Sequence, residues 1–304
     1  MAAKDNLITA AQFSAITARE VDFVTRFTKN WDALRTIMGI MRPIRKAPGT
    51  KLTSYEAEMD GDLQGGTVAE GEEIPFTKFR MVAKTYGDID IKKYAKSVSV
   101  EAVEKYGADI AVQKTDDQFL VELQNVVLDG FYTFLKTGTL KAKQDTWQKA
   151  LAIAKGSVLD KFAGMNRTVT EVVGFANIMD LYDMLGGAEI TVQTSFGLQY
   201  VQNFLGYSTL FLLPDKYIPK GTVIAIPVEN IDLYYIDPAD SDFAKLGLTY
   251  TVDGETNLIG FHAEGDYSRA SGNCYAIMGM KLWAEYLDGI AIVTVEPNAE
   301  TVKG

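Results

Sequence analysis

A long predicted β-hairpin is the feature that most limits how this chain can fold. Residues 53–59 and 76–86 each alternate apolar and polar side chains, which predicts two β-strands. The stretch between them is rich in glycine, which predicts the turn region: Gly61, Gly65, Gly66 and Gly71. An isolated two-stranded ribbon is only marginally stable in water, so this hairpin needs a support.

The two predicted strands have an apolar face and a charged face. The apolar face consists of Tyr55, Ala57 and Met59 on the outgoing strand and of Phe79, Met81 and Ala83 on the return strand. The other face carries Ser54, Glu56 and Glu58 opposite Lys78, Arg80 and Lys84, so acids and bases can pair across the ribbon. Because the apolar face is too small to sustain a free hairpin, we expect another subunit to cover it. The candidate inter-subunit contacts are Tyr55, Glu56, Met59, Lys78, Phe79, Arg80 and Met81.

The segments around the hairpin predict a mixed α+β chain. Residues 9–38 have a mostly helical pattern, and Pro43 and Pro48 then predict a hinge after this arm. Residues 109–136 form the clearest helix, with Asp109 as its cap and Gly138 at its end. At about 1.5 Å per residue this helix would be roughly 40 Å long, which makes it a candidate spine of the fold.

The second half of the chain alternates predicted helices and strands. Asp145 is expected to cap a helix over 145–156, and Asn177 to cap a short helix over 178–185 that ends at Gly186-Gly187. The strands of this part are expected at 168–176, 207–213 (stopped by Pro214) and 222–227. A β-rich end follows, with strands at 248–252, 258–267, 275–283 and 290–295.

Several kinds of chemistry find no signature in the sequence. The single histidine, His262, excludes sites that need two, and the single cysteine, Cys274, excludes an internal disulfide; each is expected to be a structural residue of a strand. The acidic clusters at Asp60-Asp62 and 237–242 do not have calcium-loop spacing and predict solvated turns. We therefore predict no catalytic residue, no metal and no cofactor. Nor does any apolar run approach the length of a membrane span.

The order of these segments resembles the major capsid proteins of tailed bacteriophages, which have the Hong Kong 97-type fold. The ribbon at 51–86 resembles the extended E-loop of that family, and residues 94–105 resemble the segment that leads into the spine helix. Residues 116–138 resemble the spine helix itself, and the Pro-Lys-Gly turn within 212–225 resembles a turn of the central domain. The resemblance covers nearly the whole chain and depends on architecture, because the family has no short invariant motif.

The resemblance implies an α+β fold with four parts. These are an N-terminal arm (1–47), the E-loop (48–87), a peripheral domain with the spine helix (88–144 and 243–304) and an axial domain (145–242). It implies a non-enzymatic protein of the phage head, made in the bacterial cytoplasm, whose pentamers and hexamers form an icosahedral shell around double-stranded DNA. A separate scaffolding protein and a portal are the expected partners, since only about fifty residues precede the ribbon. A decoration protein is also compatible with the resemblance.

The net charge of −10 bears on the nucleic acid. Proteins that grip DNA tightly do so with clustered Lys and Arg that neutralise phosphates, so we expect weak, non-specific contact with the packaged DNA. Three alternatives stay open. One is an encapsulin-like nanocompartment shell protein, one is another phage structural protein such as a tail component, and one, of a different class, is a carboxylate-based hydrolase.

Overall fold

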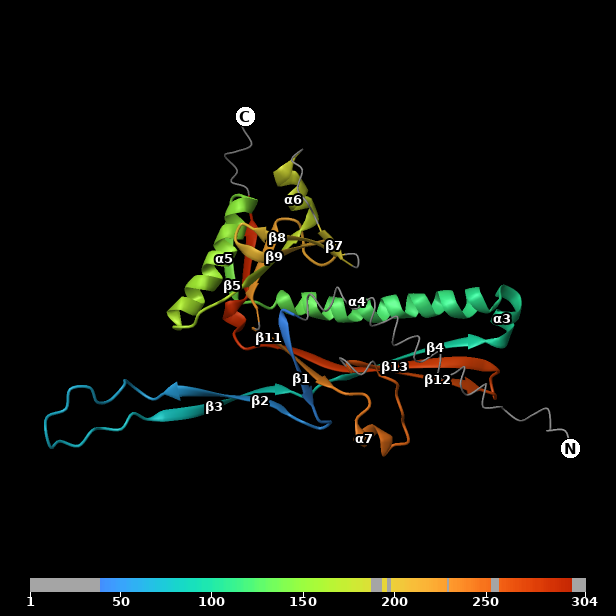
Figure 1. The fold of residues 1–304 in the computed structure, drawn as a ribbon, viewed down its shortest axis with the longest axis horizontal. Coiled ribbons are helices and arrows are strands. Elements are labelled where there is room, and N and C mark those ends of the chain that lie inside the picture. The colour runs from blue at the N-terminus through green and yellow to red at the C-terminus, as the bar shows by residue number, and fades with distance from the viewer. Residues whose placement is uncertain (1–38, 187–192, 196–197, 229, 253–256, 297–304) are drawn as a thin grey trace.

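The computed structural model describes residues 39–186, 193–195, 198–228, 230–252 and 257–296. The predicted N-terminal helical arm and Gly187 lie outside the described residues. Within these ranges the chain forms a five-stranded sheet, a seven-stranded sheet and a separate two-stranded hairpin (Figure 1). The α+β fold class predicted from the sequence is confirmed.

The five-stranded sheet is built around one long strand. Its members are β1 (Met41–Lys46), β4 (Ile91–Ser99), β11 (Ile231–Ile236), β12 (Ile259–Asp266) and β13 (Ser271–Ala284). The central strand β13 pairs antiparallel with β4, β12 and β11, and β1 adds to β11 in parallel. The helix α4 (Thr115–Leu135) lies along this sheet (Figure 1). It buries Leu120, Leu123, Phe131, Tyr132 and Leu135 in the core.

The spine helix begins differently from the prediction. Ser99 caps a first helix, α3 (Val100–Tyr106), by accepting a hydrogen bond from the Ala102 amide at 3.3 Å. After Gly107 the chain continues as a π-helical turn, η1 (Asp109–Lys114), which leads directly into α4. The predicted cap at Asp109 is therefore wrong, because this residue already lies inside a helical turn. The predicted end is close: the helix stops at Leu135, and at Gly138 a Cβ atom would lie 2.6 Å from the Ile290 side chain.

The seven-stranded sheet stands at the C-terminal end of α4 (Figure 1). Its strands, in spatial order, are β5 (Leu140–Gln144), β14 (Ala291–Val295), β10 (Thr222–Pro227), β6 (Val172–Asn177), β9 (Tyr207–Leu213), β8 (Leu198–Phe204) and β7 (Gln193–Ser195). The helix α5 (Trp147–Gly164) packs on one face and buries Ala150, Leu151, Ala154 and Val158 against this sheet. The opposite face contributes Phe175, Ile224 and Ile226 to the core that α4 shares.

Two helix caps of this part were predicted, and one is right. Asn177 caps α6 (Ile178–Leu185), with its side-chain oxygen accepting from the Met179 amide at 2.9 Å. The predicted cap of α5 at Asp145 is wrong, because Thr146 occupies that position and accepts from the Lys149 amide. Asp145 forms an ion pair with the Lys149 side chain at 2.8 Å instead.

The strands do not follow the predicted boundaries at 144 and 242. β5 and β14, which we had assigned with the spine helix, belong to the seven-stranded sheet, and β11 belongs to the five-stranded sheet. The reason is long-range pairing: β14 joins β10 in antiparallel and β5 in parallel orientation, and neither partner is near it in the sequence. Local alternation predicts a strand, whereas its neighbours depend on the whole chain.

Two further local predictions are wrong. The proline-rich segment after the arm is the strand β1 rather than a hinge; Pro43 is tolerated there because β1 is an edge strand. Residues 248–252 form only an isolated bridge, between Thr251 and Phe261, and follow the short helix α7 (Ser241–Ala244). The three later strands are confirmed as β12, β13 and β14, the last preceded by the 3-10 turn η2 (Leu287–Gly289).

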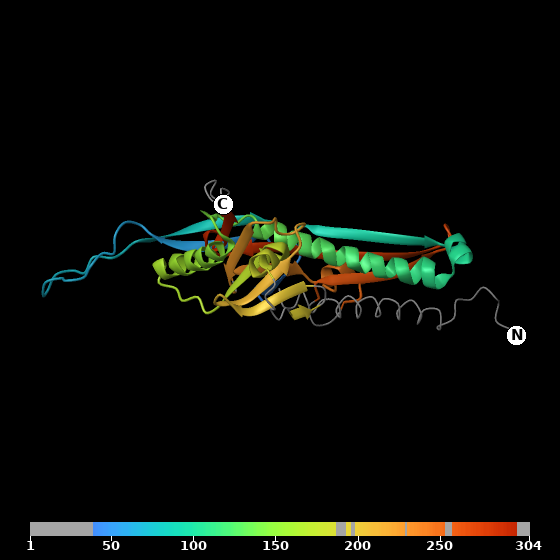
Figure 2. The same cartoon turned by 90° about the horizontal axis from the view of Figure 1, so that it is seen from above.

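The predicted hairpin is present and projects from the rest of the molecule. Its strands are β2 (Leu52–Met59) and β3 (Phe79–Gly87), so the return strand starts three residues later than expected. Figure 1 shows the hairpin extending away from both larger sheets, with the loop between its strands at the far end. Seen from above, the hairpin lies at the same side of the molecule as β4 (Figure 2).

Candidate subunit-assembly surfaces

The two strands of the hairpin share one apolar face, as the alternation predicted, and this face is exposed. The register places Tyr55 opposite Ala83 and Met59 opposite Phe79, so the apolar side chains share one face. Tyr55, Phe79 and Met81 are 65%, 60% and 64% exposed. Large apolar side chains gathered on one exposed surface mark an interaction site.

The charged face has the expected pairing where Glu58 lies opposite Arg80. Arg80 donates to Glu58 at 2.6 Å directly across the ribbon, and Lys78 pairs with Asp60 at 2.9 Å. These ion pairs are exposed, so they contribute little stability and serve mainly to hold the register.

The loop between the strands exposes apolar residues, of which Leu63 and Ile74 fall in the predicted turn region and Phe76 was expected to begin the return strand. Leu63, Ile74 and Phe76 are 75%, 67% and 90% exposed. The signal was available in the sequence, because Ile74-Pro75-Phe76 is an apolar run inside a segment otherwise made of turn and charged residues. The hairpin therefore offers apolar contacts along its shaft and at its tip.

The base of the hairpin, in contrast, is fastened to the body. Leu52 at the start of β2 is buried together with Ile89 and Ile236, and Tyr234 and Phe243 pack against this small cluster. Next to Ile89 in the chain, the backbone oxygen of Asp88 accepts a hydrogen bond from the Lys281 side chain at 2.9 Å. The hairpin thus leaves the body from a fixed point.

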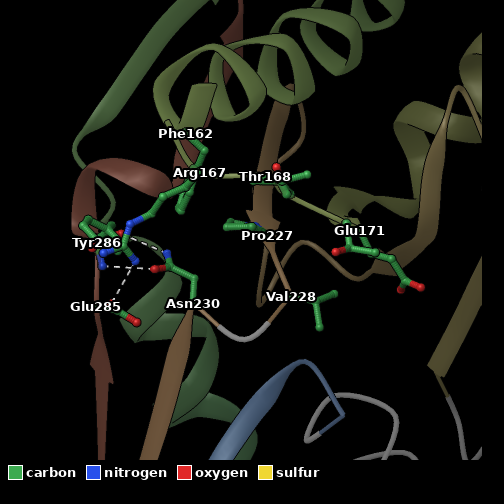
Figure 3. A pocket seen from close by; sticks show the side chains of 11 residues that line it. Phe162, Arg167, Thr168, Glu171, Pro227, Val228, Asn230, Glu285 and Tyr286 are labelled. Atoms are coloured by element: carbon green, nitrogen blue, oxygen red, sulfur yellow. Dashed lines mark hydrogen bonds and ion pairs between the residues drawn. The ribbon is translucent and has the colours of Figure 1, made fainter. Parts of the chain in front are cut away.

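A polar cavity of about 440 Å³ lies where the two larger sheets meet (Figure 3). Arg167 stacks over the Tyr286 ring at 4.8 Å and donates to Glu285 at 3.3 Å. Asn230 holds the chain beside them, donating to the Tyr286 carbonyl at 2.9 Å and accepting from the Tyr286 amide at 3.0 Å. Figure 3 shows Glu171 on the other side of the cavity from this group.

The same network continues into the five-stranded sheet. Arg42 on β1 donates to the buried Asp232 at 2.8 Å and to Glu285 at 3.1 Å. Burial alone would lower the pKa of Arg42, but the Asp232 and Glu285 carboxylates raise it overall. Glu285 thus lies between Arg42 of the five-stranded sheet and Arg167 of the segment that connects α5 to β6. These contacts fasten the segment before β6 to the five-stranded sheet.

The residues considered for other chemistry have structural surroundings. His262 lies on β12 beside the rings of Tyr250 and Tyr275, and Cys274 is buried on β13, as expected for strand residues. The prediction of a solvated turn at 237–242 is right in part: residues 238–239 form a turn and Asp242 is exposed, but Asp237 is buried and pairs with Arg45 at 3.2 Å. Among the described residues, no group of three or more His, Cys, Asp or Glu is placed to hold a metal ion.

The helices were also compared with the requirements of a membrane span. In the part of the chain that the structure describes, none combines the necessary length with sufficient apolar character.

Comparisons with known proteins identify the fold. No family model matches the chain, and no curated protein sequence matches it. Among solved structures, the mature capsid of bacteriophage PhiM1 superimposes with a TM-score of 0.55 at 7% identity, covering 84% of this chain and 86% of that one. The capsid of cyanophage P-SCSP1u gives 0.54 at 7% identity, with 86% and 88% covered. The SrpI encapsulin of Synechococcus elongatus PCC 7942 gives 0.51 at 10% identity, with 87% and 88% covered.

These likenesses define the class of fold: a shell-forming α+β fold shared by phage capsids and an encapsulin. More particularly, the chain has the Hong Kong 97-type fold of tailed-phage capsid proteins, as its segment order predicted. The superimposed neighbours are shell proteins rather than enzymes. At these low identities the likeness establishes the fold alone.

Proposed function

We propose that this chain is the major capsid protein of a tailed bacteriophage. In this role its pentamers and hexamers form the icosahedral shell of the phage head around double-stranded DNA. The observation that carries the proposal is the hairpin: it has a buried base and an exposed apolar face. A single subunit gains nothing from holding Tyr55, Phe79 and Met81 in water, whereas a neighbouring subunit could bury them.

The energetics favour a repeated contact. At about 25 cal/mol per Å² of buried apolar area, covering this face contributes on the order of a few kcal/mol per subunit. That is modest for one pair of subunits but recurs at every subunit of a closed shell. A hairpin of one copy on a different surface of the next is a heterologous contact, which closes into rings and so suits five- and six-fold assemblies.

The two larger sheets would occupy different positions in such a shell. We assign the five-stranded sheet and α4 to the peripheral part, and the seven-stranded sheet with α5 and α6 to the axial part that surrounds the five- and six-fold axes. A separate scaffolding protein and a portal would complete the assembly. The net charge of −10 supports only weak, non-specific contact of the subunit with DNA.

An encapsulin-type shell is the second candidate, because an encapsulin superimposes nearly as well as the phage capsids do. The two functions differ in what the shell contains. Particles isolated from the natural source would hold DNA if the chain is a phage capsid protein. A packaged protein cargo in place of DNA would favour the encapsulin-type function.

Electron microscopy of the purified chain tests the proposal most directly. We expect closed shells, or rings of five and six subunits, under conditions that promote assembly. In a companion variant, a short Gly-Ser linker replaces residues 55–82, which removes the shaft and tip of the hairpin but no residue of the two main cores. This variant should melt like the wild type in circular dichroism yet form no shells in sedimentation.

Two outcomes would contradict the proposal. A wild-type chain that stays monomeric under all assembly conditions would remove the capsid function itself. A linker variant that still closes into shells would show that the hairpin is not the assembly arm, and one that unfolds would show that the hairpin belongs to its own subunit's core.

A further inference from the structure

The tip of the hairpin has an unusual composition. Residues 60–77 contain five acidic side chains and no basic one: Asp60, Asp62, Glu70, Glu72 and Glu73. All five are exposed, and among the described residues only Asp60 forms an ion pair, with Lys78. The same loop exposes Leu63, Ile74 and Phe76. A partner surface for this tip should therefore combine positive charge with an apolar floor.

The chain itself contains such a surface. A cleft of about 630 Å³ lies between the end of α4 and the edge of the seven-stranded sheet, on the face that α5 does not cover. Three lysines line it and no acid does: Lys136, Lys141 and Lys143. The apolar residues of its lining that are not fully buried and lie on this face are Pro219 and Ile292. Lys143 pairs with Glu296 at 2.8 Å, while Lys136 and Lys141 have no ion pair within the described part of the chain.

The tip cannot reach this cleft within one subunit. Figure 1 shows the hairpin pointing away from the corner that α4 makes with the seven-stranded sheet, with the tip at the far end. The shaft is fixed at Leu52, so it cannot fold back without losing its buried base. A second copy of the chain is therefore the source from which a tip could come.

We propose that the acidic, apolar tip of one subunit docks in the lysine-lined cleft of a second copy. Glu72 and Glu73 face Lys136 and Lys141 across this contact, and Ile74 and Phe76 cover the apolar residues of the cleft. The inference rests on the proposed shell function and adds to it the surface that the hairpin tip binds on the neighbouring subunit. It also explains why the loop keeps large apolar side chains in water in the free subunit.

A second cleft is a less suitable docking place for the acidic tip. It measures about 390 Å³ between α4 and the five-stranded sheet and has a more apolar lining, including Phe134, Met278 and Met280. Its rim mixes Lys92 and Lys281 with Asp90, and Lys281 already donates to the Asp88 carbonyl. Because the tip is strongly acidic, the cleft with three lysines and no acid fits it better.

Charge exchange tests the contact without touching either core. The first variant carries Glu72→Lys and Glu73→Lys in the tip, and the second carries Lys136→Glu and Lys141→Glu in the cleft. Each turns two attractions into repulsions, so we expect each to raise the lowest subunit concentration that forms shells about tenfold, which corresponds to about 1.4 kcal/mol. The variant with all four changes should return to within about threefold of the wild type, because the attraction is restored with its signs exchanged.

A matched control separates a specific contact from a general effect of charge. Lys92→Glu with Lys93→Glu makes the same change on exposed residues of β4. Combined with the tip variant, it should not restore assembly. Restored assembly with the β4 pair would overturn the assignment to the lysine-lined cleft. Normal assembly of the tip variant alone and of the cleft variant alone would overturn it as well. Failure of the wild type to form shells would refute the proposed function first, so the two failures are distinguishable.

Discussion

The chain contains two long antiparallel strand pairs, β12 with β13 and β2 with β3, and both have alternating apolar and polar side chains. The apolar face of the first pair is buried, whereas that of the second is exposed. In β12 and β13, Phe261, Ala276 and Met278 are buried under the spine helix. In β2 and β3, Tyr55 and Phe79 point into solvent. Alternating side chains therefore specify pairing and faces, but not whether the apolar face belongs to the subunit's own core. The difference separates the residues that fold this protein from those available for assembly.

Removing a core ring should show the largest effect on folding. Phe261→Ala in β12 leaves a cavity beside α4, so we expect a loss of about 3–5 kcal/mol in the free energy of unfolding. Urea denaturation of the free subunit measures it. The paired change Phe79→Ala in the hairpin should stay within about 0.5 kcal/mol, as exposed substitutions usually do. Equal losses at both positions would abolish the distinction between the two strand pairs.

Removing the cation of a buried ion pair should have an effect of intermediate size on the free energy of unfolding. Arg42→Met leaves the buried Asp232 carboxylate without its nearest cation, which should destabilise the free subunit by about 1–3 kcal/mol. Thermal melting at constant ionic strength checks it. Asp232→Asn in the Arg42→Met background should recover part of the loss, because an amide is less costly to bury than an unpaired carboxylate. No loss on removing Arg42 would mean that this cation does not stabilise the buried Asp232 carboxylate.

The apolar face of the hairpin should affect assembly and not folding. Phe79→Ser with Met81→Ser removes exposed apolar area, so unfolding of the monomer should change by no more than about 0.5 kcal/mol. Shell formation should need about tenfold more protein or fail, since about 1.4 kcal/mol per subunit is a tenfold change. Sedimentation across a concentration series measures it. A normal assembly threshold would show that another surface carries the contact.

The smallest effect is expected at the exposed ion pair across the hairpin. Arg80→Met breaks the 2.6 Å contact with Glu58 and should change the stability of the free subunit by less than about 1 kcal/mol. If the pair holds the register, assembly should weaken slightly and the weakening should fade at high salt, where exposed charges are screened. A melting shift as large as that of Arg42→Met would place the hairpin within the subunit's own cooperative fold.

Local patterns in the sequence determined a good part of this protein. The alternation of 53–59 gave the strand and its faces, and the spacing of apolar residues gave the spine helix up to Leu135. Asn177 was recognisable as a cap because a short polar side chain before an apolar run satisfies free amide groups of the first turn. Each of these features depends on neighbours within a few residues. The overall order of segments, through its resemblance to phage capsid proteins, then indicated the fold.

Only the tertiary structure decided which residues far apart in the sequence come into contact. Only the fold shows that β14 joins β5 and β10, that Asp237 is buried against Arg45, and that Lys136 and Lys141 line one cleft. Strand pairing and charge burial depend on contacts between residues far apart in the chain, and local periodicity carries no information about which partners meet. For the same reason the exposure of Phe76 at the hairpin tip became visible only when the body of the molecule was seen to leave it uncovered.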